Sequence, residues 1–122
     1  MAKQFEHGPD GIMEMGTANN ITYIKYYNGL MIQYGETSIT ASSSRSSGGL
    51  TYYSGTSGRI DLPVAFVGNV SCSTNVRIAN LSFFSSSSAA ADSNATYITV
   101  NFYCTNQNES RGVQFMLIGK WK

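Results

Sequence analysis

Charged side chains are scarce in this chain. Lys and Arg together number eight and Asp and Glu seven, which gives the 122 residues a formal net charge of +1. A nearly neutral chain lacks the basic surface that binds nucleic acid and the polybasic segment that binds a membrane. Its apolar runs also stay well short of the ~18 residues that would span a bilayer. We therefore expect no nucleic-acid partner and no membrane insertion, and any partner is met through shape and hydrogen bonds.

Histidine is almost absent, and with it the commonest means of acid–base catalysis. The sole histidine, His7, lies in a polar leader segment. The acidic residues are scattered, the serines form no G-x-S-x-G turn, and the glycines follow no phosphate-binding pattern. The sequence therefore predicts a protein that is not an enzyme, with no catalytic residue, no cofactor and no metal site.

Cysteine is also rare, since Cys72 and Cys104 are the only two. Each lies in a run of alternating apolar and polar residues, so both side chains can face one core. Two cysteines do not make a disulfide framework, and the pattern favours free buried thiols over a bridge.

Residues that favour helices are few, whereas Ser, Thr, Asn, Gly and Tyr are abundant. Two runs alternate apolar and polar side chains, with Val70, Cys72, Thr74, Val76 and Ile78 on one face of the first and Thr96, Ile98, Val100, Phe102 and Cys104 on one face of the second. A period of two predicts half-buried strands. Short strands at roughly ten-residue spacing predict an all-β fold, a small antiparallel β-sandwich. The run Phe115 to Ile118, apolar at successive positions, predicts a strand covered on both faces, in the centre of the sandwich or against another subunit.

The remaining segments are expected to be linkers and loops. Residues 1–20 are polar and weakly periodic, so they are predicted to be a linker or tag, with the compact domain spanning 21–122 and beginning near Ile21. After Ile39, "TASSSRSSGGL" is predicted to be a loop, and "SSSSAAADSN" a second one. The segment 50–69 is predicted to hold a short strand, a Ser-Gly turn and a further strand. Because Pro63 lacks a backbone donor, that further strand should lie at a sheet edge or begin at a bulge.

The stretch "YIKYYNGLMIQYG", residues 23–35, predicts a β-hairpin whose register depends on its turn. A two-residue turn at Asn28-Gly29 leaves both faces mixed. A three-residue loop with Gly29 at positive φ pairs Tyr26 with Leu30 and separates the faces. One face then holds Thr22, Ile24, Tyr26, Leu30, Ile32 and Tyr34, and the other Tyr23, Lys25, Met31 and Gln33. We expect this bulged turn and a half-buried, amphipathic ribbon.

Three motifs occur in order along most of the chain, from about Gly11 to Lys122. They are "GIMEMGTANNITYIKYYNGLMIQYG", "LPVAFVGNVSCS" and the closing "FMLIGKWK". Together they resemble the C-terminal tip domain of bacteriophage and prophage tail fibres and receptor-binding proteins. That family is marked by a "YIK-aromatic-x-[ND]-G-x-x-I-x-[YW]-G" hairpin, a "PVAF" strand and a final "IG-[RK]-W-K". The chain departs from the pattern at Leu117, where an aromatic or small residue is more usual.

The resemblance implies a β-sandwich related in shape to H-type lectins, assembled as a homotrimer at the distal end of a virion's tail fibre. It implies a bacterial surface polysaccharide or another host receptor as the partner, and residues 1–20 could then be the end of a fibre stalk. The family supplies no common catalytic or ligand residues. Its matching positions, among them Gly29, Pro63 and Trp121, are structural by their chemistry. A module that only ends and trimerises a fibre is the alternative function.

Candidate ligand contacts follow from residue chemistry. An aromatic ring with a hydroxyl can stack on a sugar and hydrogen-bond it, and Tyr52 and Tyr53 flank the Ser-Gly segments. Successive strand residues point to opposite faces, so one of the two tyrosines should be in the core and the other exposed. Arg45, in the serine-rich segment, would add a charged donor for an acidic glycan. We expect Trp121, large for an exposed position, to be buried against the sheet or an adjacent protomer.

Overall fold

The computed structural model is built from β-strands and describes residues 11–76, 84–89 and 94–122. The strands in chain order are β1 (Ile12–Ala18), β2 (Ile21–Tyr26), β3 (Leu30–Ala41), β4 (Ser43–Ser47), β5 (Leu50–Asp61), β6 (Val67–Val76), β7 (Phe84–Ala89), β8 (Tyr97–Cys104) and β9 (Glu109–Lys120). Within the described ranges no helix is long and apolar enough to cross a membrane.

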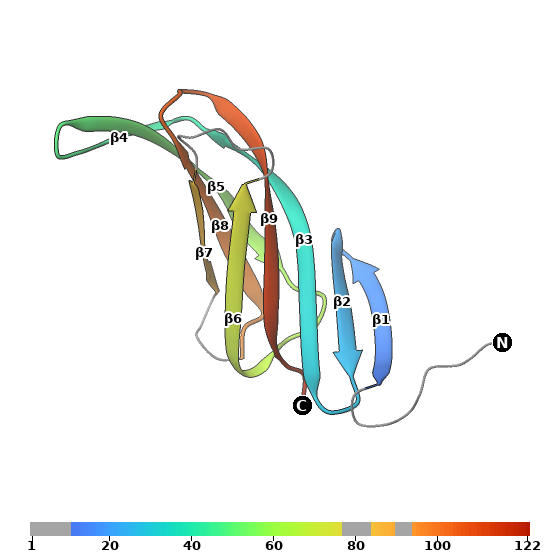
Figure 1. The fold of residues 1–122 in the computed structure, drawn as a ribbon. Coiled ribbons are helices and arrows are strands. Elements are labelled where there is room, and N and C mark those ends of the chain that lie inside the picture. Colours follow the sequence, from blue (N-terminus) through green and yellow to red (C-terminus); the bar gives the residue numbers. More distant parts are fainter. Residues whose placement is uncertain (1–10, 77–83, 90–93) are drawn as a thin grey trace.

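The strands form two antiparallel sheets that lie face to face (Figure 1). Sheet A has the order β1-β2-β3-β9-β6, and sheet B the order β4-β5-β8-β7. Strand β3 contacts β5 and β8 of sheet B, and β6 contacts β7, while β1 and β2 extend sheet A beyond this overlap. The prediction of an all-β, antiparallel β-sandwich is confirmed.

The core lies between the inner faces of the two sheets. Strand β8 places Ile98, Val100 and Phe102 there without any exposed surface, in the alternation predicted for this run. Val76 is likewise buried at the end of β6, where each second residue turns inward, while Ile78 lies outside the described residues. Both cysteines are free as predicted, and Cys104 is buried whereas Cys72 is half-buried.

The hairpin of β2 and β3 has the predicted register. Ile24 pairs with Ile32, Gly29 has φ of 100°, and its N–H donates to the Tyr26 carbonyl over 3.0 Å. The orientation of the ribbon is the reverse of the expected one, because the apolar face of a half-buried amphipathic ribbon should be the buried face. Met31 and Gln33 are fully buried on the inner face, and the apolar set is turned to the outside. The Nε2 of the buried Gln33 donates to the Val64 carbonyl over 2.7 Å, while its Oε1 is buried without a hydrogen-bond partner among the described residues.

The predicted start of the compact domain near Ile21 is wrong for sheet A. Strand β1 begins at Ile12 and pairs with β2 from Ile12↔Tyr26 to Ala18↔Ile21. The tight turn between them is made by Asn19 and Asn20, both at positive φ. Asparagine tolerates that conformation, so a polar stretch that resembled a linker closes a second hairpin. His7 lies outside the described residues.

Both serine-rich segments were expected to be loops, and both contain strands. Strand β4 pairs with β5, and Ser47 faces Leu50 across Gly48 and Gly49, which have φ of 58° and 83°. Two glycines at positive φ make the tight hairpin turn that matches strand twist. In the second segment β7 pairs with β8. Serine disfavours strands only weakly, and main-chain pairing with an established neighbour outweighs that preference.

Strand β5 is continuous where a strand, a turn and a second strand were predicted. The Ser57-Gly58 step is a bulge in its pairing with β8, since the register shifts between Thr56 and Arg59 and Gly58 has φ of 70°. Pro63 lies in the connection between β5 and β6, so it interrupts no ladder, and the predicted edge position or bulge there is wrong. Trp121 is half-buried against the core, and its Nε1–H donates to the Tyr26 carbonyl over 2.8 Å.

Candidate functional site

The outer face of sheet B carries a pocket beside the β4–β5 hairpin. We call it the hairpin pocket; its volume is about 270 Å³ and it is lined by Thr40, Ser42, Ser43, Arg45, Ser54, Gly55, Thr56, Asn101 and Tyr103. Strand register explains the gathering, because Ser54 faces both Ser43 of β4 and Tyr103 of β8. Directly opposed residues point to the same side of a sheet.

Arg45 is the one charged residue that lines the hairpin pocket. Its Nε–H donates to the Ser54 hydroxyl over 3.2 Å, which holds the guanidinium at the pocket wall. In the described part of the chain, the ion pairs join Lys25 to Glu14, Arg59 to Asp61 and Arg111 to Glu109, so the Arg45 guanidinium has no carboxylate partner there. Its remaining donors are available to a ligand.

Tyrosine rings border the same pocket. Tyr52 pairs with Arg45 across the hairpin, and its ring lies 6.3 Å from the Tyr103 ring, centroid to centroid, at an angle of 57°. Tyr53 points the other way and packs against the core. The structure thus brings together two of the three residues proposed as ligand contacts, Arg45 and Tyr52, and takes Tyr53 to the inner face.

Sequence reasoning missed two lining residues of this pocket, Tyr103 and Asn101. Both lie on the polar side of the alternating run in β8, facing Ser54 and Thr56 of β5. An aromatic side chain on the outward face of a strand was the available signal. Its importance depends on the pairing of β5 with β8, which joins segments far apart in the sequence.

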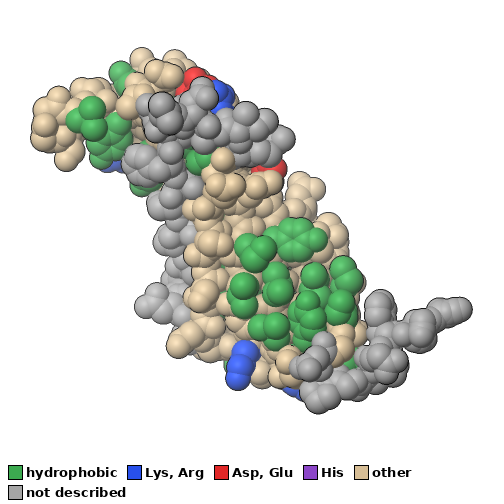
Figure 2. Space-filling view, viewed as in Figure 1, with side chains coloured by type: hydrophobic (Ala, Val, Ile, Leu, Met, Phe, Trp, Pro, Cys, Tyr) green, Lys and Arg blue, Asp and Glu red, His purple; other side chains and the backbone are tan. Residues whose placement is uncertain are grey.

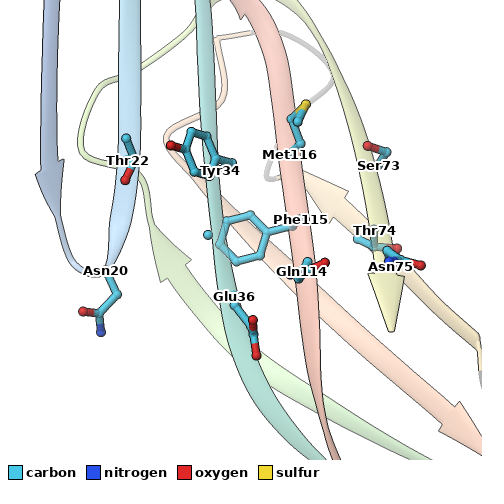
Figure 3. A pocket seen from close by; sticks show the side chains of 11 residues that line it. Asn20, Thr22, Tyr34, Glu36, Ser73, Thr74, Asn75, Gln114, Phe115 and Met116 are labelled. Carbon is cyan, nitrogen blue, oxygen red and sulfur yellow. The ribbon is translucent and has the colours of Figure 1, made fainter. Parts of the chain in front are cut away.

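A second concavity lies on the outer face of sheet A, on the opposite side of the sandwich. We call it the sheet groove; its volume is about 530 Å³ and it crosses β2, β3, β9 and β6 (Figure 3). Tyr34 and Met116 project side by side from β3 and β9, next to Glu36 and Gln114. The groove is more apolar than the hairpin pocket and has no arginine or lysine in its lining.

Carboxylates are rare in the two concavities, since the sheet groove is lined by one, Glu36, and the hairpin pocket by none. No cluster of three or more His, Cys, Asp or Glu that could hold a metal ion occurs among residues 11–76, 84–89 and 94–122. The best-defined perturbed pair is Tyr23 and Glu14 on the inner side of β1 and β2. The Tyr23 hydroxyl donates to Glu14 Oε2 over 2.8 Å, which raises the pKa of Tyr23 and lowers the pKa of Glu14. The pair lies outside both concavities and stabilises the edge hairpin.

Comparisons with known proteins return similar structures but no named family. No protein-family model matches the chain, and no curated protein matches it. Among solved structures, the chain is similar to a C-terminal fragment of the R1 pyocin fibre of P. aeruginosa, with 17% identity and a TM-score of 0.49 over 87% of this chain and 27% of that one. It is also similar to an N-truncated R1-type pyocin tail fibre, with 16% identity and a TM-score of 0.44 over 87% of this chain and 84% of that one. The chain therefore spans about a quarter of the length of the first of these neighbours.

Proposed function

We propose that this chain is the receptor-binding tip of a phage or prophage tail fibre, and that it binds a bacterial surface glycan through the hairpin pocket. The observation that carries the proposal is the convergence of Arg45, Tyr52, Tyr103 and Asn101 on one outer face. The tail-fibre role is supported by the resemblance of the three ordered motifs. On this proposal the chain lies at the distal end of a virion's fibre as a homotrimer.

The chemistry of the hairpin pocket suits a sugar. Serine and threonine hydroxyls and the Asn101 amide supply donors and acceptors without net charge. Tyrosine rings offer apolar faces on which a pyranose can stack, and the Arg45 guanidinium can form a bidentate pair with a carboxylate or sulfate. Single sites of this kind bind weakly, and several copies on one fibre raise the apparent affinity.

A direct test uses an array of bacterial polysaccharides probed with the full chain. Arg45→Ala and Tyr103→Ala should each weaken binding by roughly tenfold or more, the size expected for a central contact. Arg59→Ala is the matched control, because this exposed arginine belongs to β5 but pairs with Asp61 outside the pocket. Equal binding by the wild type, Arg45→Ala and Tyr103→Ala would overturn the assignment of the site.

The alternative is a module that only terminates and trimerises a fibre. The apolar side chains on the outer face of sheet A favour this second function, since they suit assembly and offer nothing to a sugar. A wild-type chain that forms a stable trimer and binds neither the array nor any bacterial cell would support it.

A further inference from the structure

The outer face of sheet A is apolar across four neighbouring strands. Pairing aligns Met15, Ile24, Ile32 and Ile118 in one row, and Tyr34 with Met116 in the next. We call these six residues the apolar face. Met15 is 54% exposed, and Tyr34, Met116 and Ile118 are each 42–43% exposed. Figure 2 shows the resulting patch on the side of the molecule that Figure 1 presents.

The apolar face is a consequence of strands that are apolar on both sides. In β3 and β9 the inward residues Met31 and Leu117 are fully buried, and their neighbours Ile32 and Ile118 point outward. Strands with this pattern belong to sheets that are covered on both faces. Sheet B covers the inner side of β3 and β9, so the chain itself supplies one of the two covers.

The chemistry of the apolar face selects a protein as its partner. Five of its six side chains are Met or Ile, which offer a sugar no hydrogen bonds beyond a weak sulfur acceptor. Among the described residues no charged side chain lies within it, and Lys120 and Glu36 lie at its two ends on the same side of the sheet. The hydroxyl and amide groups of the sheet groove, such as Thr22 and Gln114, continue from it as a polar margin. An apolar centre with a polar rim is the usual anatomy of a protein–protein interface.

The extent of the apolar face matches one side of an interface between two copies. At roughly 200 Å² per large side chain, its exposed fractions leave on the order of 400 Å² of apolar surface open. A standard interface buries about 800 Å² on each partner, of which about 65% is apolar when the partners are identical. A net charge of +1 does not hold copies apart.

We propose that the apolar face is the surface through which copies of this chain associate. The number of copies rests on the proposed homotrimer; the choice of face does not. Association through sheet A leaves the hairpin pocket on the outer face of sheet B open to a ligand. The outer face of sheet A would then serve assembly, and the outer face of sheet B would bind the ligand.

The test compares association of charge-insertion variants of the full chain by light scattering and sedimentation from about 1 to 100 µM. Ile118→Lys should raise the dissociation constant at least tenfold, the effect of losing a central interface contact. The double variant Ile32→Lys/Ile118→Lys should be monomeric over the whole range. Leu50→Lys is the matched control, because Leu50 is 58% exposed and lies at the tip of the β4–β5 hairpin. Circular dichroism and thermal unfolding establish that each variant is folded.

Three outcomes would overturn the proposal: a wild type that stays monomeric at 100 µM, a folded double variant that keeps the wild-type mass, or a Leu50→Lys variant that dissociates as readily as Ile118→Lys. The polysaccharide array separates this result from the proposed function. A monomeric wild type whose binding still depends on Arg45 refutes only the assembly face. A chain that associates through the apolar face and binds no polysaccharide refutes only glycan recognition.

Discussion

A methyl group added at Gly55 has no space in this structure. The Cβ of an alanine there would overlap the Thr40 carbonyl oxygen, and it would lie 2.7 Å from the Thr40 carbonyl carbon and 2.9 Å from Ile39 Cγ2. Two of these three obstacles are main-chain atoms of β3, which cannot rotate away. At Gly55 the backbone of β5 lies directly against Thr40 of β3, so Gly55→Ala must separate the two strands.

The cost follows from the kind of atom that is displaced. Overpacking a core ordinarily costs 1–3 kcal/mol, because side chains can shift to absorb part of it. Here the backbone must move, so we expect a loss of about 3 kcal/mol or more in the free energy of unfolding. For a domain of this size that loss lowers Tm by roughly 10–15 °C.

The free energy of unfolding and the Tm of Gly55→Ala and Gly58→Ala are measured by urea denaturation and thermal unfolding. Gly58 lies three residues away in the same strand, and nothing lies within 4 Å of the position that a Cβ would occupy there, although its φ is +70°. Its replacement should cost only about 1 kcal/mol, from the left-handed backbone. A Gly55→Ala protein as stable as Gly58→Ala would refute the close approach of β5 to β3. Because Gly55 also lines the hairpin pocket, the same variant should weaken polysaccharide binding.

Two further predictions concern the β1–β2 end of sheet A. Glu14→Gln should lower the pKa of Tyr23 toward 10.0, followed by NMR titration of labelled tyrosine, because the Glu14 carboxylate raises that pKa. In the wild type the raised pKa of Tyr23 adds stability below pH 10, and this stability is lost as the pH rises through the folded-state pKa of Tyr23. The lowered pKa of Glu14 adds stability above pH 4.5, which is lost as the pH falls through the folded-state pKa of Glu14. An unchanged Tyr23 titration in Glu14→Gln would contradict the assigned cause of the raised Tyr23 pKa. Trp121→Phe should reduce the free energy of unfolding by about 1–2 kcal/mol, since the Tyr26 carbonyl loses its indole donor; equal urea midpoints for the two proteins would show that this hydrogen bond contributes nothing.

The parts of the fold that depend on local chemistry could be predicted from the sequence. Gly29 at positive φ follows from a turn that must keep two faces separate, and the alternation in β8 places Phe102 in the core. The serine-rich strands could not be predicted this way. Strand β4 exists because Gly48 and Gly49 return the chain onto β5, and β5 is held by β8, whose paired residues lie 36 to 51 positions further along the sequence. The hairpin pocket is assembled by those same pairings, so Arg45 and Tyr52 were found as single candidates while Tyr103 was not.

The facing of the β2–β3 hairpin shows why a clean apolar pattern does not identify the core side. Register determines which residues share a face, but the far end of β3 determines which face turns inward. Ile39 and Ala41 are buried there at odd-numbered positions of one continuous strand, so Met31 and Gln33 must also point inward and Ile32 and Tyr34 outward. The arrangement leaves on the order of 400 Å² of apolar surface in water, worth roughly 10 kcal/mol if it were covered. Ile118 pairs on its other side with Ser71, so the same row of the outer face ends in a polar side chain at β6. The apolar side chains of Ile32 and Ile118 fit the proposed association of copies through this face.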